Sequence, residues 1–452
     1  MSSADEVRKT MRRNTNPNFL KAFAALLMLI AVAPGTIAAA SQKASAPPQQ
    51  EEKSSEIEKQ LHAAQDALNR KDYQAAVESL EAVVKAQPDF DAAWFNLAYA
   101  YTALGRNDDA IATYDKVLKL NPDLVQAQMN LGILLLESKR APEAADHFAE
   151  AVELDASNPR NHLYYGRALV QAGEREEAAK QFQETLRLDP KSAIAAFDLG
   201  QLYYDEKKYD EASKAFGTAA ELEPKLAQAQ LGMALAAEGL KARAEAAEHF
   251  ELYLAAQPDD AETRFHLAKI YLDLGKNEQA LKCLETLKQI RPNLRGLAAA
   301  LGDAYALLKK YPEAEEAYRK ALVSQPGDAD LHRALGQSLL EEKKNEEAEA
   351  EFLTALKIDP RNREALKGLA SAVYLEKRYE DAIPLYEALA KSPDSPGVYF
   401  LLATCYDHLH IIRKALENYE LYLQNSPDTN SDQQWQAEQR AKVLRNQLKR
   451  QL

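Results

Sequence analysis

Small and apolar residues recur along most of the chain at a fixed spacing of 34 residues. When positions are counted from Ile57 in steps of 34, position 8 is small in every copy: Ala64, Ala98, Gly132, Gly166, Gly200, Ala234, Ala268, Gly302, Gly336 and Ala370. Position 20 is always alanine: Ala76, Ala110, Ala144, Ala178, Ala212, Ala246, Ala280, Ala314, Ala348 and Ala382. An eleventh copy begins at Pro396, with the spacing shifted by one residue. A phase held over so many copies indicates a repeat architecture.

Each copy contains two segments of helical length, whose apolar residues recur every three to four positions, joined by a short turn. This pattern predicts one helix hairpin in each repeat. The small residue at position 8 and the alanine at position 20 let two helices approach closely, and an aromatic residue at position 24, such as Phe216, fills the space beside them. One hairpin cannot bury its apolar face alone, so we expect neighbouring hairpins to stack into an all-α solenoid.

The second repeat carries the fullest form of the pattern: Trp94, Leu97, Ala98 and Tyr101, then Ala110 and Tyr114, then Pro122. With these residues and this period, the chain resembles the tetratricopeptide-repeat family over residues 57–429. The resemblance implies a right-handed α-solenoid of about eleven helix hairpins. The expected repeats are 57–90, 91–124, 125–158, 159–192, 193–226, 227–260, 261–294, 295–328, 329–362, 363–395 and 396–429. Residues 430–452 are expected to form a helix that caps the open end of the last hairpin, with Ala441, Leu444, Leu448 and Leu452 on its apolar face. The alternative is a basic tail that binds a partner.

The N-terminal segment 1–40 has the features of an export signal. Five basic residues between Arg8 and Lys21 precede an apolar run from Ala22 to Ala33, and small residues precede Ser41. The run is short for a membrane span, which needs about 20 residues, so we expect a signal peptide that is cleaved before Ser41, with an uncleaved N-terminal anchor as the alternative. Residues 41–56 are polar and are expected to form a disordered linker. The predicted location is the periplasm or the extracellular space.

Charge and motifs exclude several functional classes. The net charge of −13 argues against a nucleic-acid partner, because phosphates need basic side chains to neutralise them, and against membrane contact by the mature body. The chain contains no phosphate-binding glycine-rich loop and no hydrolase or metalloprotease motif. His408 and His410 point to different faces of a helix, so they do not predict a metal site. Cys283 and Cys405 are expected to be buried small hydrophobic residues that do not pair. We therefore predict a non-enzymatic protein without cofactor or metal.

The family resemblance also implies a binding surface. In that family the first helices of successive repeats line a concave groove that binds extended peptides. Carried onto this chain, the groove residues are Phe95, Asn96, Tyr99, Met129, Asn130, Ile133, Leu163, Tyr164, Arg167, Phe197, Asp198 and Tyr204. The residues at position 5, such as Phe95, could equally pack between first helices. Asn96 and Asn130 occupy the same position in consecutive repeats. We therefore expect both amides to form hydrogen bonds with the backbone of one bound peptide.

These observations leave two principal interpretations of function. The first is an exported scaffold or adaptor that binds proteins or peptide segments in its groove, in cell-envelope assembly or secretion. The alternative is a substrate-docking or regulatory arm of a separate enzyme, for example in a glycosyltransferase or polysaccharide-export system. A purely structural spacer is a third interpretation.

Overall fold

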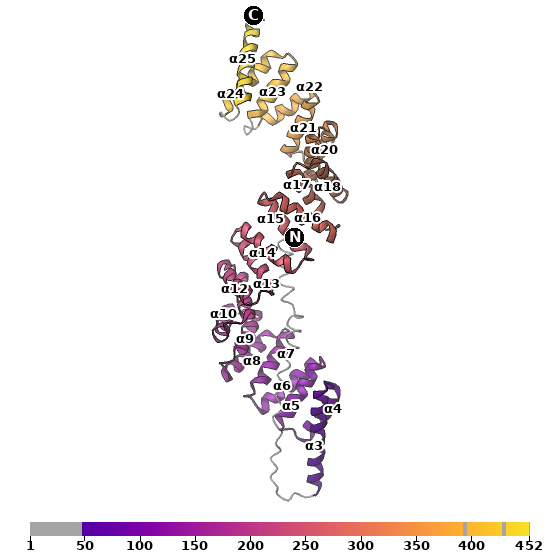
Figure 1. Cartoon of the computed structure of the whole chain (residues 1–452), viewed down its shortest axis with the longest axis vertical. Helices are drawn as coiled ribbons and strands as arrows, with labels where there is room; N and C mark the ends of the chain where they lie inside the picture. The colour runs from indigo at the N-terminus through magenta and orange to yellow at the C-terminus, as the bar shows by residue number, and fades with distance from the viewer. Residues whose placement is uncertain (1–47, 392–395, 427–430, 452) are drawn as a thin grey trace. The chain divides into compact units, whose positions relative to one another are not determined.

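The computed structural model describes residues 48–391, 396–426 and 431–451, and this part of the chain is α-helical throughout, without a β-strand (Figure 1). The predicted signal segment 1–40 lies outside the described residues. None of the helices in the described part is long and apolar enough to cross a membrane.

The helices divide into two compact units, one ending at Pro258 and the other beginning at Asp259. The first unit contains α3 (Pro48–Asn69), α4 (Tyr73–Ala86), α5 (Asp91–Ala103), α6 (Asn107–Leu120), α7 (Val125–Glu137), α8 (Ala141–Leu154), α9 (Pro159–Ala172), α10 (Arg175–Leu188), α11 (Ala193–Asp205), α12 (Tyr209–Leu222), α13 (Ala227–Gly239) and α14 (Arg243–Ala256). The second contains α15 (Ala261–Asp273), α16 (Asn277–Ile290), α17 (Leu297–Leu307), α18 (Tyr311–Ser324), α19 (Ala329–Glu341), α20 (Asn345–Ile358), α21 (Arg363–Leu375), α22 (Tyr379–Ala390), α23 (Pro396–His408), α24 (Ile412–Asn425) and α25 (Ser431–Gln451).

Within each unit the helices form successive antiparallel hairpins, and each hairpin packs against the next (Figure 1). The described helices make eleven hairpins, α3–α4 to α23–α24, followed by α25. The predicted all-α solenoid of about eleven hairpins with a final helix is therefore confirmed. Ala437, Ala441 and Leu444 of α25 are buried against the last hairpin, as the capping prediction requires.

The turn inside every hairpin has one residue with left-handed backbone geometry, always at position 15. Three repeats have glycine there, whereas seven have lysine and one has His410: the non-glycine residues are Lys71, Lys139, Lys207, Lys241, Lys309, Lys343, Lys377 and His410, with φ between 58° and 63°. A left-handed residue ends the first helix and reverses the chain. The sequence pattern did not single out this position, because lysine is an unusual residue for it.

In nine of the eleven described repeats an aromatic ring at position 24 lies in the core; the first and seventh repeats have Leu80 and Leu284 there. Phe216 is fully buried, and a Cβ added to Gly200 at position 8 would lie 2.7 Å from its ring. Gly232, at position 6 of the next repeat, approaches the same ring from the other side, and its added Cβ would lie 2.8 Å away. The Phe216 ring thus leaves no room for a Cβ at Gly200, and a ring so close to position 8 explains why that position is never larger than alanine.

One predicted boundary is wrong. Helix α3 begins at Pro48, so residues 48–56, which the sequence analysis assigned to a disordered linker, are helical. A proline is well suited to the first position of a helix, because no intrahelical partner exists there for a backbone N–H. The predicted linker segment from 41 to 47 lies outside the described residues.

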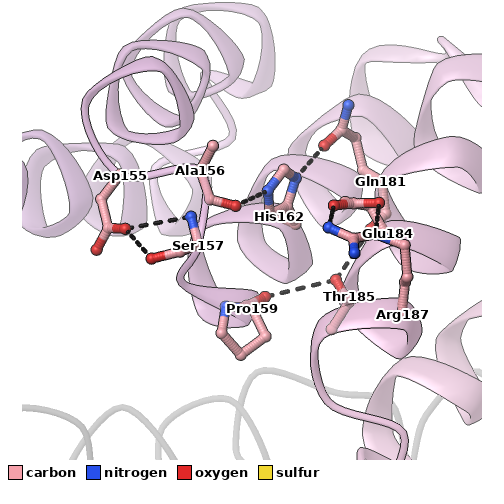
Figure 2. A network of polar contacts seen from close by, with 9 residues as sticks. All are labelled: Asp155, Ala156, Ser157, Pro159, His162, Gln181, Glu184, Thr185 and Arg187. Atoms are coloured by element: carbon pink, nitrogen blue, oxygen red, sulfur yellow. Dashed lines mark hydrogen bonds and ion pairs between the residues drawn. The ribbon is translucent and has the colours of Figure 1, made fainter.

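In several repeats the side chain at position 4 forms a hydrogen bond with the backbone of the loop that precedes its helix. Trp94, Gln128, His162 and His332 each donate a hydrogen bond to the carbonyl oxygen six residues earlier, at 2.8–3.2 Å. Figure 2 shows this hydrogen bond at His162: its Nε2 donates to Ala156, and its Nδ1 lies 2.7 Å from Oε1 of Gln181 at position 23. Histidines at this position therefore have a structural explanation.

Candidate functional site

The predicted groove residues at position 5 belong largely to the core. Phe95 and Phe197 are only 6–7% exposed, and their rings contact the position-24 rings of the same repeats, Tyr114 at 5.7 Å and Phe216 at 5.5 Å. Met129 and Leu163 are half-buried. For the two phenylalanines the structure favours packing, the interpretation that the sequence left open beside peptide contact.

Residues at position 6 face the position-24 ring of the preceding repeat. Asn130 donates a hydrogen bond from Nδ2 to the hydroxyl oxygen of Tyr114 at 3.0 Å, and Tyr114 is 1% exposed. Tyr164 stacks on Phe148 in the equivalent place, with 5.7 Å between ring centroids. Asn130 thus provides a hydrogen bond to a buried hydroxyl group of the core. This corrects the expectation that the amide at this position is there only to bind a ligand.

Asn96 occupies the same position but has different surroundings. The preceding residue at position 24 is Leu80, which has no polar atom to bind. Asn96 is partly exposed, and within the described part of the chain it makes no hydrogen bond to another side chain. Tyr99, one turn later on α5, is also partly exposed; burial, together with the nearby Tyr73, raises its pKa to about 12, so its hydroxyl stays protonated.

Arg167 and Asp198 bind each other across two first helices. Nε of Arg167 on α9 donates to Oδ2 of Asp198 on α11 at 2.6 Å, and both side chains are 18% exposed. The guanidinium also lies 5.8 Å from the ring centroid of Tyr164. Tyr204, the last predicted groove residue, is half-buried, and its ring packs 5.7 Å from that of Tyr209.

All twelve predicted residues therefore lie on α5, α7, α9 and α11 of the first unit, but they differ in how available they are. Phe95, Tyr164 and Phe197 are buried, while Asn130, Arg167 and Asp198 are bound to neighbours. The partly exposed residues that remain are Asn96, Tyr99, Met129, Ile133, Leu163 and Tyr204.

Sequence reasoning missed two hollows in the second unit. The first, of about 670 Å³, lies between α15, α17, α18 and α19. Inside it the hydroxyl of Tyr318 donates to Asp303 at 2.8 Å, and loss of hydration raises the pKa of Asp303. The sequence feature that could have revealed this site is the acidic Asp303 at position 9 together with tyrosine, rather than phenylalanine, at position 24.

The second hollow, of about 710 Å³, lies between α21, α23, α24 and α25. Its lining contains six aromatic or imidazole rings: Tyr374, Phe400, His408, His410, Tyr419 and Trp435. Trp435 is 63% exposed, which is high for so large an apolar side chain. The predicted cap and the alternative of a basic tail that binds a partner both leave out this aromatic face of α25.

The described side chains offer little catalytic chemistry. Among the described residues no group of three or more His, Cys, Asp or Glu side chains is placed to hold a metal ion. Cys405 is buried as expected, and burial raises the pKa of its thiol to about 12, which disfavours the thiolate needed for nucleophilic attack. Cys283 is only half-buried, which corrects the expectation for that residue.

Comparison with known proteins identifies the repeats. A family model described as tetratricopeptide repeat matches residues 61–125, 103–159, 166–221, 203–261 and 333–396, which together exceed half of the chain. Two further tetratricopeptide-repeat models match residues 239–303 and 297–330. The comparison with curated proteins gives no match.

Several solved structures match part of the chain. MamA from Desulfovibrio magneticus RS-1 is 22% identical and covers 38% of this chain and 97% of its own, with a TM-score of 0.37. YrrB, described as a protein with an unusual peptide-binding site, is 23% identical and covers 42% and 97%, with a TM-score of 0.38. The C-terminal part of a repeat protein from Cytophaga hutchinsonii is 17% identical and covers 53% and 98%, with a TM-score of 0.48. With its repeat period, its eleven helix hairpins and these family matches, the chain belongs to the tetratricopeptide-repeat family, whose members are generally protein-binding scaffolds.

Proposed function

We propose that this protein is an exported, non-enzymatic scaffold that binds extended segments of other proteins on the first helices of its first unit, and that it acts in cell-envelope assembly or secretion. Family membership supports a protein partner. The basic, apolar and small-residue order of segment 1–40 supports export.

The observation that carries the binding site is the unpaired amide of Asn96. An amide offers one acceptor and two donors, enough to bind a peptide C=O and N–H together. Asn96 is partly exposed, and the half-buried Tyr99, Met129 and Ile133 lie on the same pair of first helices, α5 and α7. This arrangement suits an extended peptide. The amide can form hydrogen bonds with the peptide backbone, and the surrounding apolar groups can select the peptide's side chains.

Replacing Asn96 by alanine is expected to weaken peptide binding about two- to thirteenfold, which corresponds to the loss of about 0.5–1.5 kcal/mol for one hydrogen-bonding group. The measurement is calorimetric titration of the chain from Ser41 with peptides selected against it from a random display library. The melting temperature should not change, because the amide of Asn96 has no hydrogen-bond partner among the described residues.

Asn130→Ala is the matched control, since it removes the same amide one repeat later. This variant should lose stability, because the hydroxyl of Tyr114 loses its partner. Unchanged affinity in Asn96→Ala, with peptides that do bind the parent chain, would contradict the proposed site.

Export is expected to leave a mature N-terminus near Ser41. Intact-mass spectrometry of the protein purified from its native cells measures this directly. A chain that retains Met1 or Met11 and sediments with membranes would contradict cleavage and indicate an N-terminal anchor instead.

A further inference from the structure

The aromatic hollow at the C-terminal end of the second unit is formed partly by a face of α25 that capping does not use. Trp435, Gln439 and Val443 are spaced four residues apart, so they lie on one face of the helix. Trp435 is 63% exposed and Val443 is 43% exposed, whereas the capping residues are buried. A solenoid cap needs a buried inner face and a polar outer face. An exposed tryptophan and valine at the edge of a hollow therefore point to a ligand.

The charges in the lining of this hollow cancel. Arg440 donates from Nε and Nη2 to the two carboxylate oxygens of Asp407, at 2.5 and 2.8 Å. The side chain of Asp407 is only 12% exposed, so this bidentate pair is partly shielded from water. A strongly charged ligand would have to compete with the pair without gaining an unpaired opposite charge. The hollow is therefore suited to an uncharged ligand.

The walls of the hollow are helices, and this limits how a peptide backbone can bind. Backbone N–H and C=O groups within α21, α23, α24 and α25 are already paired inside each helix. An extended ligand cannot add to them as it would to the edge of a sheet. Its backbone can be bound only by side chains, and every ligand N–H without an acceptor costs free energy.

The polar side chains around the rings can supply donors for ligand carbonyl groups. The indole Nε1–H of Trp435 is a donor only, and the amides of Gln436 and Gln439 each carry two donor hydrogens. In the described part of the chain none of these three side chains is bound to another residue. A proline residue presents a carbonyl oxygen without an N–H, so it uses these donors and leaves no backbone donor unpaired.

We propose that this hollow binds an uncharged, proline-rich segment of a partner protein in the polyproline II conformation. Pyrrolidine rings pack against the faces of Trp435, Phe400 and Tyr374, and the carbonyl groups between them accept hydrogen bonds from the indole and the amides. The polyproline helix is already extended before binding, so little conformational entropy is lost. The inference rests on the proposed function in one respect, since both assign a protein partner to the chain. The two sites lie in different units and use different residues.

The test uses the emission of Trp435 as the reporter. The chain has two tryptophans, so Trp94→Phe leaves Trp435 as the single one. A proline decamer, titrated up to about 1 mM, is expected to shift the emission to shorter wavelength with saturation as the indole leaves water. A glycine–serine decamer of equal length should produce no shift. Absence of a saturable shift with the proline decamer, or an equal shift with a lysine or glutamate decamer, would overturn the proposal.

A second measurement covers the case in which Trp94→Phe alters the fold. Calorimetry of the proline decamer with the natural sequence, from Ser41, should show binding that Trp435→Ala weakens at least about tenfold, as for an aromatic anchor. Val323→Ala is the control, since Val323 is 84% exposed on α18, outside the hollow. Equal affinity of Trp435→Ala and Val323→Ala would overturn the proposal. Asn96→Ala should leave decamer binding unchanged, so failure of the groove in the first unit is distinguishable from failure of this site.

Discussion

Replacing Phe216 by alanine is expected to lower the free energy of unfolding of the hairpins around it by about 3–5 kcal/mol. The ring of Phe216 is fully buried and packs 5.5 Å from the ring of Phe197. It also separates Gly200 of its own hairpin from Gly232 of the next. Neither glycine has a side chain that could move into the space, so the cavity would remain and the two hairpins would lose their shared contact.

The loss should be local, because each repeat of a solenoid contacts only its neighbours. Hydrogen exchange resolved by peptide should therefore accelerate in α11, α12 and α13 and change little in α3 or α4. Leu252→Ala, at a side chain that is 54% exposed on α14, is the control and should stay within about 0.5 kcal/mol of the parent. Unchanged exchange in α11–α13 would contradict the assigned packing.

A pair of glycine substitutions tests the same contact from the other side. Glycine inside a helix normally destabilises it by about 0.5–1 kcal/mol relative to alanine, so Gly217→Ala on α12 should stabilise. An added Cβ at Gly217 meets only Met233, at an ordinary 3.7 Å. Gly200→Ala should instead destabilise, by about 1–3 kcal/mol, because its Cβ would lie too close to the Phe216 ring. Equal stabilisation by both substitutions would contradict this account.

The contact at Phe216 also shows what the sequence could predict. Small residues at position 8 and aromatic residues at position 24 recur with the repeat, so their contact within one hairpin follows from periodicity alone. The hairpins were predicted for the same reason, whereas the final helix was predicted from apolar residues on one face of its own segment. The contact with Gly232 was not predicted, because it joins two repeats and its residue type changes from repeat to repeat.

The same inter-repeat contact explains why the groove was predicted only in part. Asn96 and Asn130 have the same position and the same side chain, so a comparison of equivalent positions does not distinguish them. They differ because Asn130 follows a repeat with Tyr114 at position 24, whereas Asn96 follows one with Leu80. A position-by-position comparison of repeats misses such a pair, since the two partners lie in different copies. The aromatic hollow was missed because α25 belongs to no repeat.

The ion pair between Arg167 and Asp198 leads to the second large expected effect. Asp198→Ala should lower the free energy of unfolding by about 3 kcal/mol, the lower end of the range for removing one partner of a buried pair. The side chain of Arg167 is 18% exposed and would keep its charge without the carboxylate that binds Nε. Urea denaturation with hydrogen exchange in α9 and α11 measures the loss. Glu184→Ala is the control, because its pair with Arg187 is exposed and should contribute at most about 1 kcal/mol.

Removing both charges separates the structural contribution of this pair from a contribution to binding. Arg167→Met combined with Asp198→Leu leaves no unpaired charge, so most of the stability lost in Asp198→Ala should return. Both residues belong to the predicted groove, and the guanidinium uses Nε for Asp198, which leaves its two terminal nitrogens to bind a peptide carbonyl or carboxylate. If the pair also binds the ligand, the restored double variant should still bind the selected peptides about fivefold or more weakly, the loss of one charge-assisted hydrogen bond. Full affinity together with full stability would assign Arg167 and Asp198 to the solenoid alone and leave Asn96 as the polar contact of the groove.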